Sequence, residues 1–251
     1  MHSPKYTIVF VLILSAVTAL LLSGMYTGLK DIHEKNEAIF NKRAILSAID
    51  TQMDIPVDEM TDDEVLELFN NSIEQIVLDM KGNILTKEQV EAKGYKGGLA
   101  EKVSLNAERK KPEDQRILPL FKFNKDGKTT YIICVIGNGL WDIIWGYIAL
   151  GPDGNTIAGA AFDHKNETPG LGAEIRDNAD FPASFIGKKI YDNQGKYHSV
   201  SVVKGGAKDL DFEVDGISGA TLTGDGVSEM MVRGVAYYNP YLKSIQSAKN
   251  N

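Results

Sequence analysis

The longest apolar run of the chain lies near its N-terminus, where residues 8–25 carry no charge. As a helix, this run spans about 27 Å at roughly 1.5 Å per residue, close to the hydrocarbon core of a bilayer at about 30 Å. A cleaved signal peptide is the alternative, but the run is long for one and lacks a clear cleavage site of small residues. The pattern favours a retained transmembrane helix over about residues 8–26, within an N-terminal segment of residues 1–30.

The pattern after this run predicts further helices. Residues 31–49 place apolar side chains at helical spacing among many charges, which is typical of an amphipathic helix. Thr61 and Glu64 form a capping-box pattern, and the apolar positions that follow predict a helix through about Leu78. Residues 101–116 are rich in charge and are expected to form a surface loop. Residues 31–116 are therefore predicted to be a helical and mixed N-terminal part of the soluble region.

A different pattern begins at residue 117. Residues 117–163 contain several short β-branched or alternating runs, separated by turn sequences at residues 125–128 and 151–154. Cys134 lies within one of these runs, and we expect it to pack in the core. Residues 227–238 return to helical spacing. The pattern predicts an α+β domain over residues 117–251, with a central sheet that is at least partly antiparallel.

Composition excludes several classes of protein. The 251 residues are 43% hydrophobic, which argues against disorder. The formal net charge is −7 and the isoelectric point is near 5.2, so no net basic field exists to attract nucleic acid. The single cysteine excludes an intramolecular disulfide. No metal site is predicted.

Residues 215–226 are the most informative part of the sequence and read Asp-Gly-Ile-Ser-Gly-Ala-Thr-Leu-Thr-Gly-Asp-Gly. Three hydroxyl residues lie among four glycines, between a β-type pattern and a helical one. A glycine-rich turn from strand to helix lets the backbone approach a ligand, and the helix N-terminus offers free N–H groups to an anion. Helix capping by Thr221, Thr223 or Asp225 alone is the simpler explanation of such a string. Either way, the turn suits a phosphate.

Six positions of this motif match a known pattern in order: Asp215, Gly216, Ser218, Gly219, Ala220 and Thr221. They resemble the flavinylation motif of the FMN-carrying subunit of the sodium-translocating NADH:quinone reductases (Na⁺-NQR) and of its counterpart in Rnf-type ferredoxin:NAD complexes. The resemblance implies that the hydroxyl of Thr221 is esterified to the phosphate of FMN by a separate flavin transferase. It also implies contacts to the cofactor from Ser218, Gly219 and Thr223. The redox chemistry then belongs to the flavin ring.

A second stretch matches the same family. Residues 167–172 read Glu-Thr-Pro-Gly-Leu-Gly, the signature of a loop that packs against the flavin in that family. A Pro-Gly turn between a strand and a helix is the simpler explanation. The resemblance implies these further cofactor contacts: Thr168, Gly170, Leu171 and Gly172.

Other residues near these stretches are weaker candidates. His164 and Glu167 are a possible proton-transfer pair, although a histidine beside a loop is more often structural. Residues 137–147 resemble a Gly-x-Gly-Leu-Trp stretch of the family, from which we expect Trp145 to contact the flavin; a core role for Trp141 and Trp145 is the alternative. Lys204 is a candidate counter-charge for a phosphate, although a solvated lysine is more common.

Two other classes of protein share parts of the pattern. Residues 216–220 are similar to the nucleophile elbow of α/β-hydrolases, with Ser218 as the nucleophile, but no histidine follows Ser218 in the chain. A membrane-tethered sensor that binds a small anion reversibly at the same turn is the non-catalytic alternative. Neither explains the Glu-Thr-Pro-Gly-Leu-Gly string.

The resemblance therefore implies a single-span protein of the bacterial inner membrane, with a periplasmic α+β domain that relays electrons through FMN on Thr221. The complex would oxidise NADH, reduce ubiquinone and export Na⁺, and the catalytic activity would belong to this assembly. This chain lacks a dinucleotide-type glycine turn and a polar transmembrane span, so we expect it to bind neither NADH nor quinone nor Na⁺ itself. The equivalent component of an Rnf-type complex is the alternative.

Overall fold

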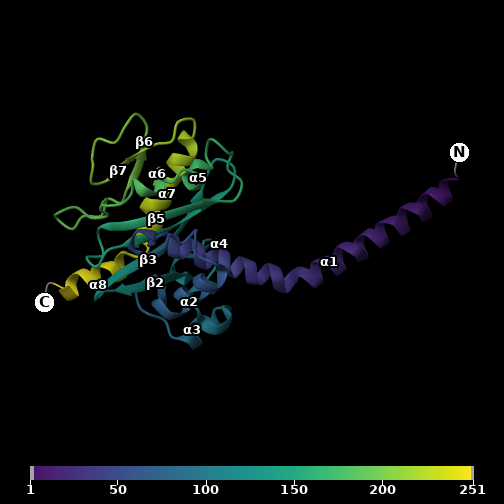
Figure 1. Cartoon of the computed structure of the whole chain (residues 1–251), viewed down its shortest axis with the longest axis horizontal. Helices are drawn as coiled ribbons and strands as arrows, with labels where there is room; N and C mark the ends of the chain where they lie inside the picture. Colours follow the sequence, from purple (N-terminus) through teal and green to yellow (C-terminus); the bar gives the residue numbers. More distant parts are fainter. Residues whose placement is uncertain (1–2, 250–251) are drawn as a thin grey trace. The chain divides into compact units, whose positions relative to one another are not determined.

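The computed structural model describes residues 3–249 of the chain, which divides into two compact units, residues 1–41 and 42–251 (Figure 1). The first unit is helical throughout its described part. Helix α1 (Pro4–Ser47) begins there and ends in the second unit, so the predicted anchor and the predicted amphipathic helix are one continuous helix. Within residues 3–249 it is the one helix long and apolar enough to cross a membrane, with a mean hydropathy of 2.6 in its most apolar window.

A five-stranded antiparallel sheet forms the centre of the second unit. Its strands follow one another in chain order: β1 (Ile73–Asp79), β2 (Ile117–Lys125), β3 (Lys128–Asn138), β4 (Ile143–Leu150) and β5 (Ile157–His164). A tight turn joins β2 to β3, in which Asp126 and Gly127 have φ of 52° and 72°. Such left-handed pairs match the twist of a two-residue hairpin. The predicted α+β class and antiparallel sheet are confirmed.

The helix predicted from Thr61 to Leu78 is correct only in its first part. Thr61 and Glu64 form the predicted capping box, and α2 covers Asp62–Ser72. The chain then enters β1, so the prediction is wrong from Ile73 onward. The apolar residues of this segment satisfy a helical pattern, but its backbone pairs with residues 117–123 on β2. Pairing with a strand about forty residues away overrides the local pattern.

Each face of the sheet is covered (Figure 1). Helix α7 (Thr221–Ala236) packs against β3, where a Cβ placed on Gly234 would lie 2.8 Å from Cγ1 of Val135. The hydrophobic core includes Ile133, Ile148 and Met231. On the opposite face, Phe69 of α2 packs edge-on against Phe121 of β2, with ring centroids 6.0 Å apart.

The charged segment of residues 101–116 is more ordered than the predicted surface loop. It contains a short helix, α4 (Leu105–Glu108), in which Glu108 is 1% exposed. The other elements are short or C-terminal: the 3-10 helices η1 (Asp50–Gln52), η2 (Lys96–Gly98), η3 (Ala100–Lys102) and η4 (Glu113–Gln115), and the α-helices α3 (Lys87–Ala92), α5 (Glu174–Asp177), α6 (Asp180–Ala183) and α8 (Asn239–Lys249).

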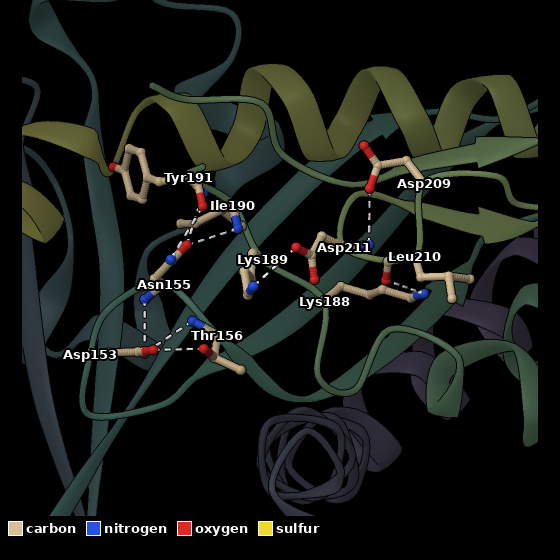
Figure 2. Close-up of polar contacts among 10 residues, drawn as sticks. All are labelled: Asp153, Asn155, Thr156, Lys188, Lys189, Ile190, Tyr191, Asp209, Leu210 and Asp211. Carbon is tan, nitrogen blue, oxygen red and sulfur yellow. Dashed lines mark hydrogen bonds and ion pairs between the residues drawn. The ribbon is translucent and has the colours of Figure 1, made fainter. Parts of the chain in front are cut away.

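A small parallel pair of strands, β6 (Ser201–Val203) and β7 (Glu213–Asp215), leads into α7. Figure 2 shows the polar contacts that fix the segment before this pair. The amide oxygen of Asn155, in the turn between β4 and β5, accepts hydrogen bonds from the N–H groups of Ile190 and Tyr191 at 3.0 and 2.8 Å. Lys189 in turn forms an ion pair with Asp211 at 3.0 Å. The approach to residues 215–226 is thus attached to the main sheet.

Candidate functional site

The N-terminus of α7 is uncapped. The helix begins at Thr221, and the residue before it, Ala220, makes no side-chain capping bond. The N–H groups of Thr221, Leu222 and Thr223 donate no hydrogen bond within residues 3–249, and the first backbone bond of the helix is Gly224 N–H to the Ala220 carbonyl at 2.9 Å. Free N–H groups at the start of a 16-residue helix favour an anion. Capping by hydroxyls therefore does not account for this motif.

A pocket of about 470 Å³ opens beside this helix start. It lies between the end of β6, with residues 202–205, and the turn of residues 216–221. Ser218 and Thr221 are the hydroxyl residues that line it, and Lys204 is the only lysine or arginine among the lining residues. Asp225, one turn into α7, is the carboxylate that also borders it. The pocket is thus bordered by the candidate acceptor, free N–H groups and one cation.

The two threonines of the motif have different surroundings. Thr221 is exposed. Thr223 is 1% exposed, and its hydroxyl donates a hydrogen bond of 2.7 Å to Oε2 of Glu167. Residues two apart on a helix point to nearly opposite sides, which explains the difference. Thr223 therefore contacts the interior rather than the pocket, contrary to its predicted place beside Thr221.

Glu167 is the buried centre of the site, with 4% of its surface exposed. Its Oε1 accepts a hydrogen bond of 2.9 Å from the N–H of Trp141, and its Oε2 accepts from Thr223. Burial opposes ionisation of this carboxyl, but the hydroxyl of Thr223 and the backbone N–H groups of residues 140–142 outweigh it and lower its pKa. Glu167 is therefore an ionised carboxylate.

His164 contacts the same loop in a way that does not form a proton-transfer pair. Its Nδ1 accepts a hydrogen bond of 3.2 Å from the backbone N–H of Glu167, and no hydrogen bond joins the two side chains within the described residues. Nε2 of His164 is buried without a hydrogen-bond partner in the same part of the chain. An Nδ1 that accepts a hydrogen bond places the proton on Nε2. The geometry supports a structural His164.

The glycines of the 167–172 loop have separate reasons. Gly170 has φ of 73° with open space around it, so only its backbone conformation requires glycine. At Gly172, a Cβ would collide with Oε2 of Glu167 and lie 2.6 Å from Oγ1 of Thr223. Gly172 therefore makes room for the buried carboxylate, and not for an external ligand as predicted from the sequence.

Apolar side chains surround the helix start on the side of this loop. Leu171 is 42% exposed and lies against Gly219 of the motif, where a Cβ would approach its Cδ2 to 2.7 Å. Trp141 is 68% exposed, and its Nε1 donates a hydrogen bond of 3.1 Å to the hydroxyl of Thr168. Thr168, Leu171, Gly219 and Thr221 are thus brought to one end of the domain.

Trp145 is not brought to this end. It pairs with Ile136 of β3 and Asp163 of β5. Its neighbour Gly146 pairs with Val135, which faces α7. Because successive strand residues point to opposite faces, Trp145 points away from α7. Trp141 is the tryptophan beside the site, and the sequence signal for it was its place just after the Gly-Asn-Gly stretch that precedes β4.

Sequence comparison places these residues within a known family. The sequence model described as the FMN-binding domain matches residues 139–236, which include the 141–142 turn, the 167–172 loop and the start of α7. The Na(+)-translocating NADH-quinone reductase component NqrC from Neisseria meningitidis serogroup A is 35% identical over 96% of this chain and 94% of its own length. The chain belongs to the NqrC family.

Solved structures agree with this assignment. The crystal structure of the family member from Parabacteroides distasonis is 32% identical, with a TM-score of 0.71, and the match covers 85% of this chain and 96% of that one. The crystal structure of Shewanella oneidensis NqrC is 25% identical, with a TM-score of 0.67, and the match covers 86% of this chain and 99% of that one. The family resemblance read from the motif is confirmed, and NqrC is favoured over its Rnf-type counterpart.

Proposed function

We propose that this chain is the membrane-anchored electron-transfer component of a Na⁺-translocating NADH:ubiquinone reductase, and that it carries FMN through a phosphodiester on Thr221. The observation that carries the proposal is the exposed hydroxyl of Thr221 at the uncapped start of α7, inside the region that matches the FMN-binding domain family. When bound, the flavin accepts and donates electrons singly or in pairs. A covalently held carrier cannot be lost to a dilute compartment.

The surroundings of the three hydroxyls support Thr221 as the acceptor. Thr223 is buried and donates to Glu167, so a phosphate cannot reach it without breaking that bond. Ser218 is exposed in the turn before the helix, whereas Thr221 is the first residue of the helix itself. A phosphodiester on Thr221 keeps one negative charge beside the free N–H groups of residues 221–223. Lys204, which makes no ion pair in the described part of the chain, supplies a counter-charge on the other side of the pocket.

The apolar residues near the helix start support a place for the ring. Trp141 and Leu171 offer exposed aromatic and aliphatic surface, and the hydrogen bond from Trp141 to Thr168 holds the indole at the loop of residues 167–172. A flat aromatic ring packs favourably on such surface. Thr168, Gly170 and Leu171 of that loop then border the cofactor, whereas Thr223, Gly172 and Trp145 do not touch it.

The attachment requires an enzyme outside this chain, because a hydroxyl does not exchange with a flavin pyrophosphate unaided. We infer that a flavin transferase delivers FMN to Thr221, and that the exposed turn around residues 215–222 is the segment it recognises. The chain then assembles with the other components of the reductase. Helix α1 anchors it in the bacterial inner membrane, and residues 42–251 lie on the periplasmic side.

The test is the intact mass of the purified full chain, co-expressed with a flavin transferase. The wild-type chain should carry one FMN, and Thr221→Ala should carry none while remaining folded, because Thr221 makes no capping bond whose loss would cost about 1 kcal/mol. Thr223→Val is the matched control and should keep the flavin. Flavin on the Thr221→Ala chain, or an unmodified wild-type chain that binds flavin only reversibly, would refute the covalent assignment.

A further inference from the structure

Glu167 is a buried ionised group whose charge no cation balances. It is 4% exposed, and no lysine, arginine or histidine forms an ion pair with it within residues 3–249. The other carboxylate of the neighbouring turn, Asp142, is paired with Lys165 at 3.1 Å. Taking an unpaired charge out of water is costly, so its retention calls for a reason.

The carboxylate joins three segments that are far apart in the sequence. Its two oxygens accept from Trp141 in the turn before β4 and from Thr223 in the first turn of α7, while its own residue belongs to the 167–172 loop. We call these two hydrogen bonds the Glu167 bridge. A Cβ on Gly139 would lie 2.5 Å from Oε1, and a Cβ on Gly172 would collide with Oε2. The space around the carboxylate is thus closed on both sides.

The bridge ends on the two parts of the site that the proposed function uses. Thr223 is two residues after the acceptor Thr221 and in the same helical turn. Trp141 donates through its backbone to Glu167 and through its indole to Thr168, so both ends of this residue are held. The acceptor and the exposed indole are therefore attached to one carboxylate.

We propose, resting on the function proposed above, that Glu167 is a positioning residue of the flavin site. Its bridge fixes the Trp141 turn and the first turn of α7 in one arrangement, and its uncompensated negative charge lowers the reduction potential of the attached flavin. Reduction adds negative charge to the flavin, and a fixed negative charge in a poorly solvated place opposes this.

Glu167→Gln separates the charge from the bridge. Its amide oxygen can accept from Trp141 N–H, and its amide nitrogen can donate to Thr223 if the hydroxyl reverses its role. The expected result is a chain that carries FMN as wild type does, with a one-electron equilibrium shifted about threefold to tenfold toward reduction, a rise of up to about 59 mV. The measurement is a spectroscopic redox titration of the purified full chain.

Glu229→Gln is the matched control, because it removes the same charge from an exposed position of α7 paired with Arg233. It should leave the potential unchanged. A Glu167→Gln chain with the potential of wild type, or a shift of the same size in the control, would overturn the electrostatic part of the proposal while leaving the flavin carrier itself intact.

Glu167→Ala tests positioning without any flavin. In the full chain produced without a transferase, amide hydrogen exchange at residues 139–142 should rise at least about tenfold in Glu167→Ala and change little in Glu167→Gln. Unchanged exchange in Glu167→Ala would overturn the positioning role. This readout does not depend on flavin attachment, whereas an unmodified wild-type chain in the co-expression experiment would refute the proposed function alone.

Discussion

Single buried carboxylates stabilise this domain through their hydrogen bonds, and Glu108 is the clearest case outside the candidate site. It accepts a hydrogen bond from the hydroxyl of Tyr95 and one of 2.9 Å from the backbone N–H of Ile117, and it pairs with Lys111 at 2.6 Å. Burial opposes ionisation of Glu108, but the three donors outweigh it and lower the pKa of its carboxyl. Burial and the same contact raise the pKa of Tyr95.

Stability should therefore depend on pH through Glu108. Because its pKa is lower in the folded chain than the usual 4.5, its contribution is fully present above about pH 4.5 and is lost as the pH falls through the folded value. Glu108→Gln should cost about 2 kcal/mol at pH 7, and the difference from wild type should shrink below about pH 4.5. Denaturant unfolding of the full chain in detergent at several pH values measures this. Glu113→Gln, at an exposed position, should show no such trend, and a pH-independent difference for Glu108→Gln would contradict the prediction.

The sequence indicated Thr221 through its motif, but it did not separate Thr221 from Thr223. The pattern placed the start of the helix near residue 227, which left both threonines in a loop where either could face a ligand. With the helix starting at Thr221, the two residues fall on opposite sides of it. The role of Glu167 was also out of reach, because it depends on contacts with residues 26 and 56 positions away.

Helix α7 links the site to the sheet through glycines that face other elements. A Cβ on Gly226 would collide with the carbonyl oxygen of Asn138, which belongs to the end of β3 just before the Trp141 turn. A Cβ on Gly224 would lie 3.2 Å from Cγ1 of Val202, a side chain that can move. The spacing of helix and sheet is thus set by backbone contact at one glycine and by side-chain contact at the other.

Gly226→Ala should therefore destabilise the domain although alanine is the better helix former. The helical propensity gain of about 1 kcal/mol is outweighed by a clash with rigid backbone, for a net loss of about 1–3 kcal/mol. Gly224→Ala, the matched control, should change the free energy of unfolding by less than about 1 kcal/mol. Thermal unfolding of both full-length variants in detergent decides between them. Equal stability of the two variants would show that the helix can shift on the sheet.

At the level of elements, local patterns were sufficient where the partner is close in the chain. The β2–β3 turn, the capping box of α2 and the run around Cys134 were predicted correctly because each depends on neighbouring residues. The segment of β1 was predicted as helix because its apolar positions fit both periods. Its strand form depends on β2, which the local sequence does not contain.

For the whole molecule, the anchor is evident in the sequence, but its direction is not. Lysines flank the apolar run of α1 on both sides, at Lys5 and Lys30, so the rule that basic residues stay in the cytoplasm decides little. The periplasmic position of residues 42–251 therefore rests on the short leader before a large C-terminal unit and on the family resemblance. A direct measurement of sidedness is possible because the chain has one native cysteine, and that cysteine is buried.

Lys128→Cys, at the exposed turn between β2 and β3, should react with a small membrane-impermeant maleimide in intact cells if residues 42–251 face the periplasm. The wild-type chain is the background control, since Cys134 is 6% exposed and burial raises the pKa of its thiol, which suppresses the reactive thiolate. Ser3→Cys, before α1, should react only after lysis. Labelling of Lys128→Cys only after lysis, together with labelling of Ser3→Cys in intact cells, would invert the orientation and place the flavin on the cytoplasmic side.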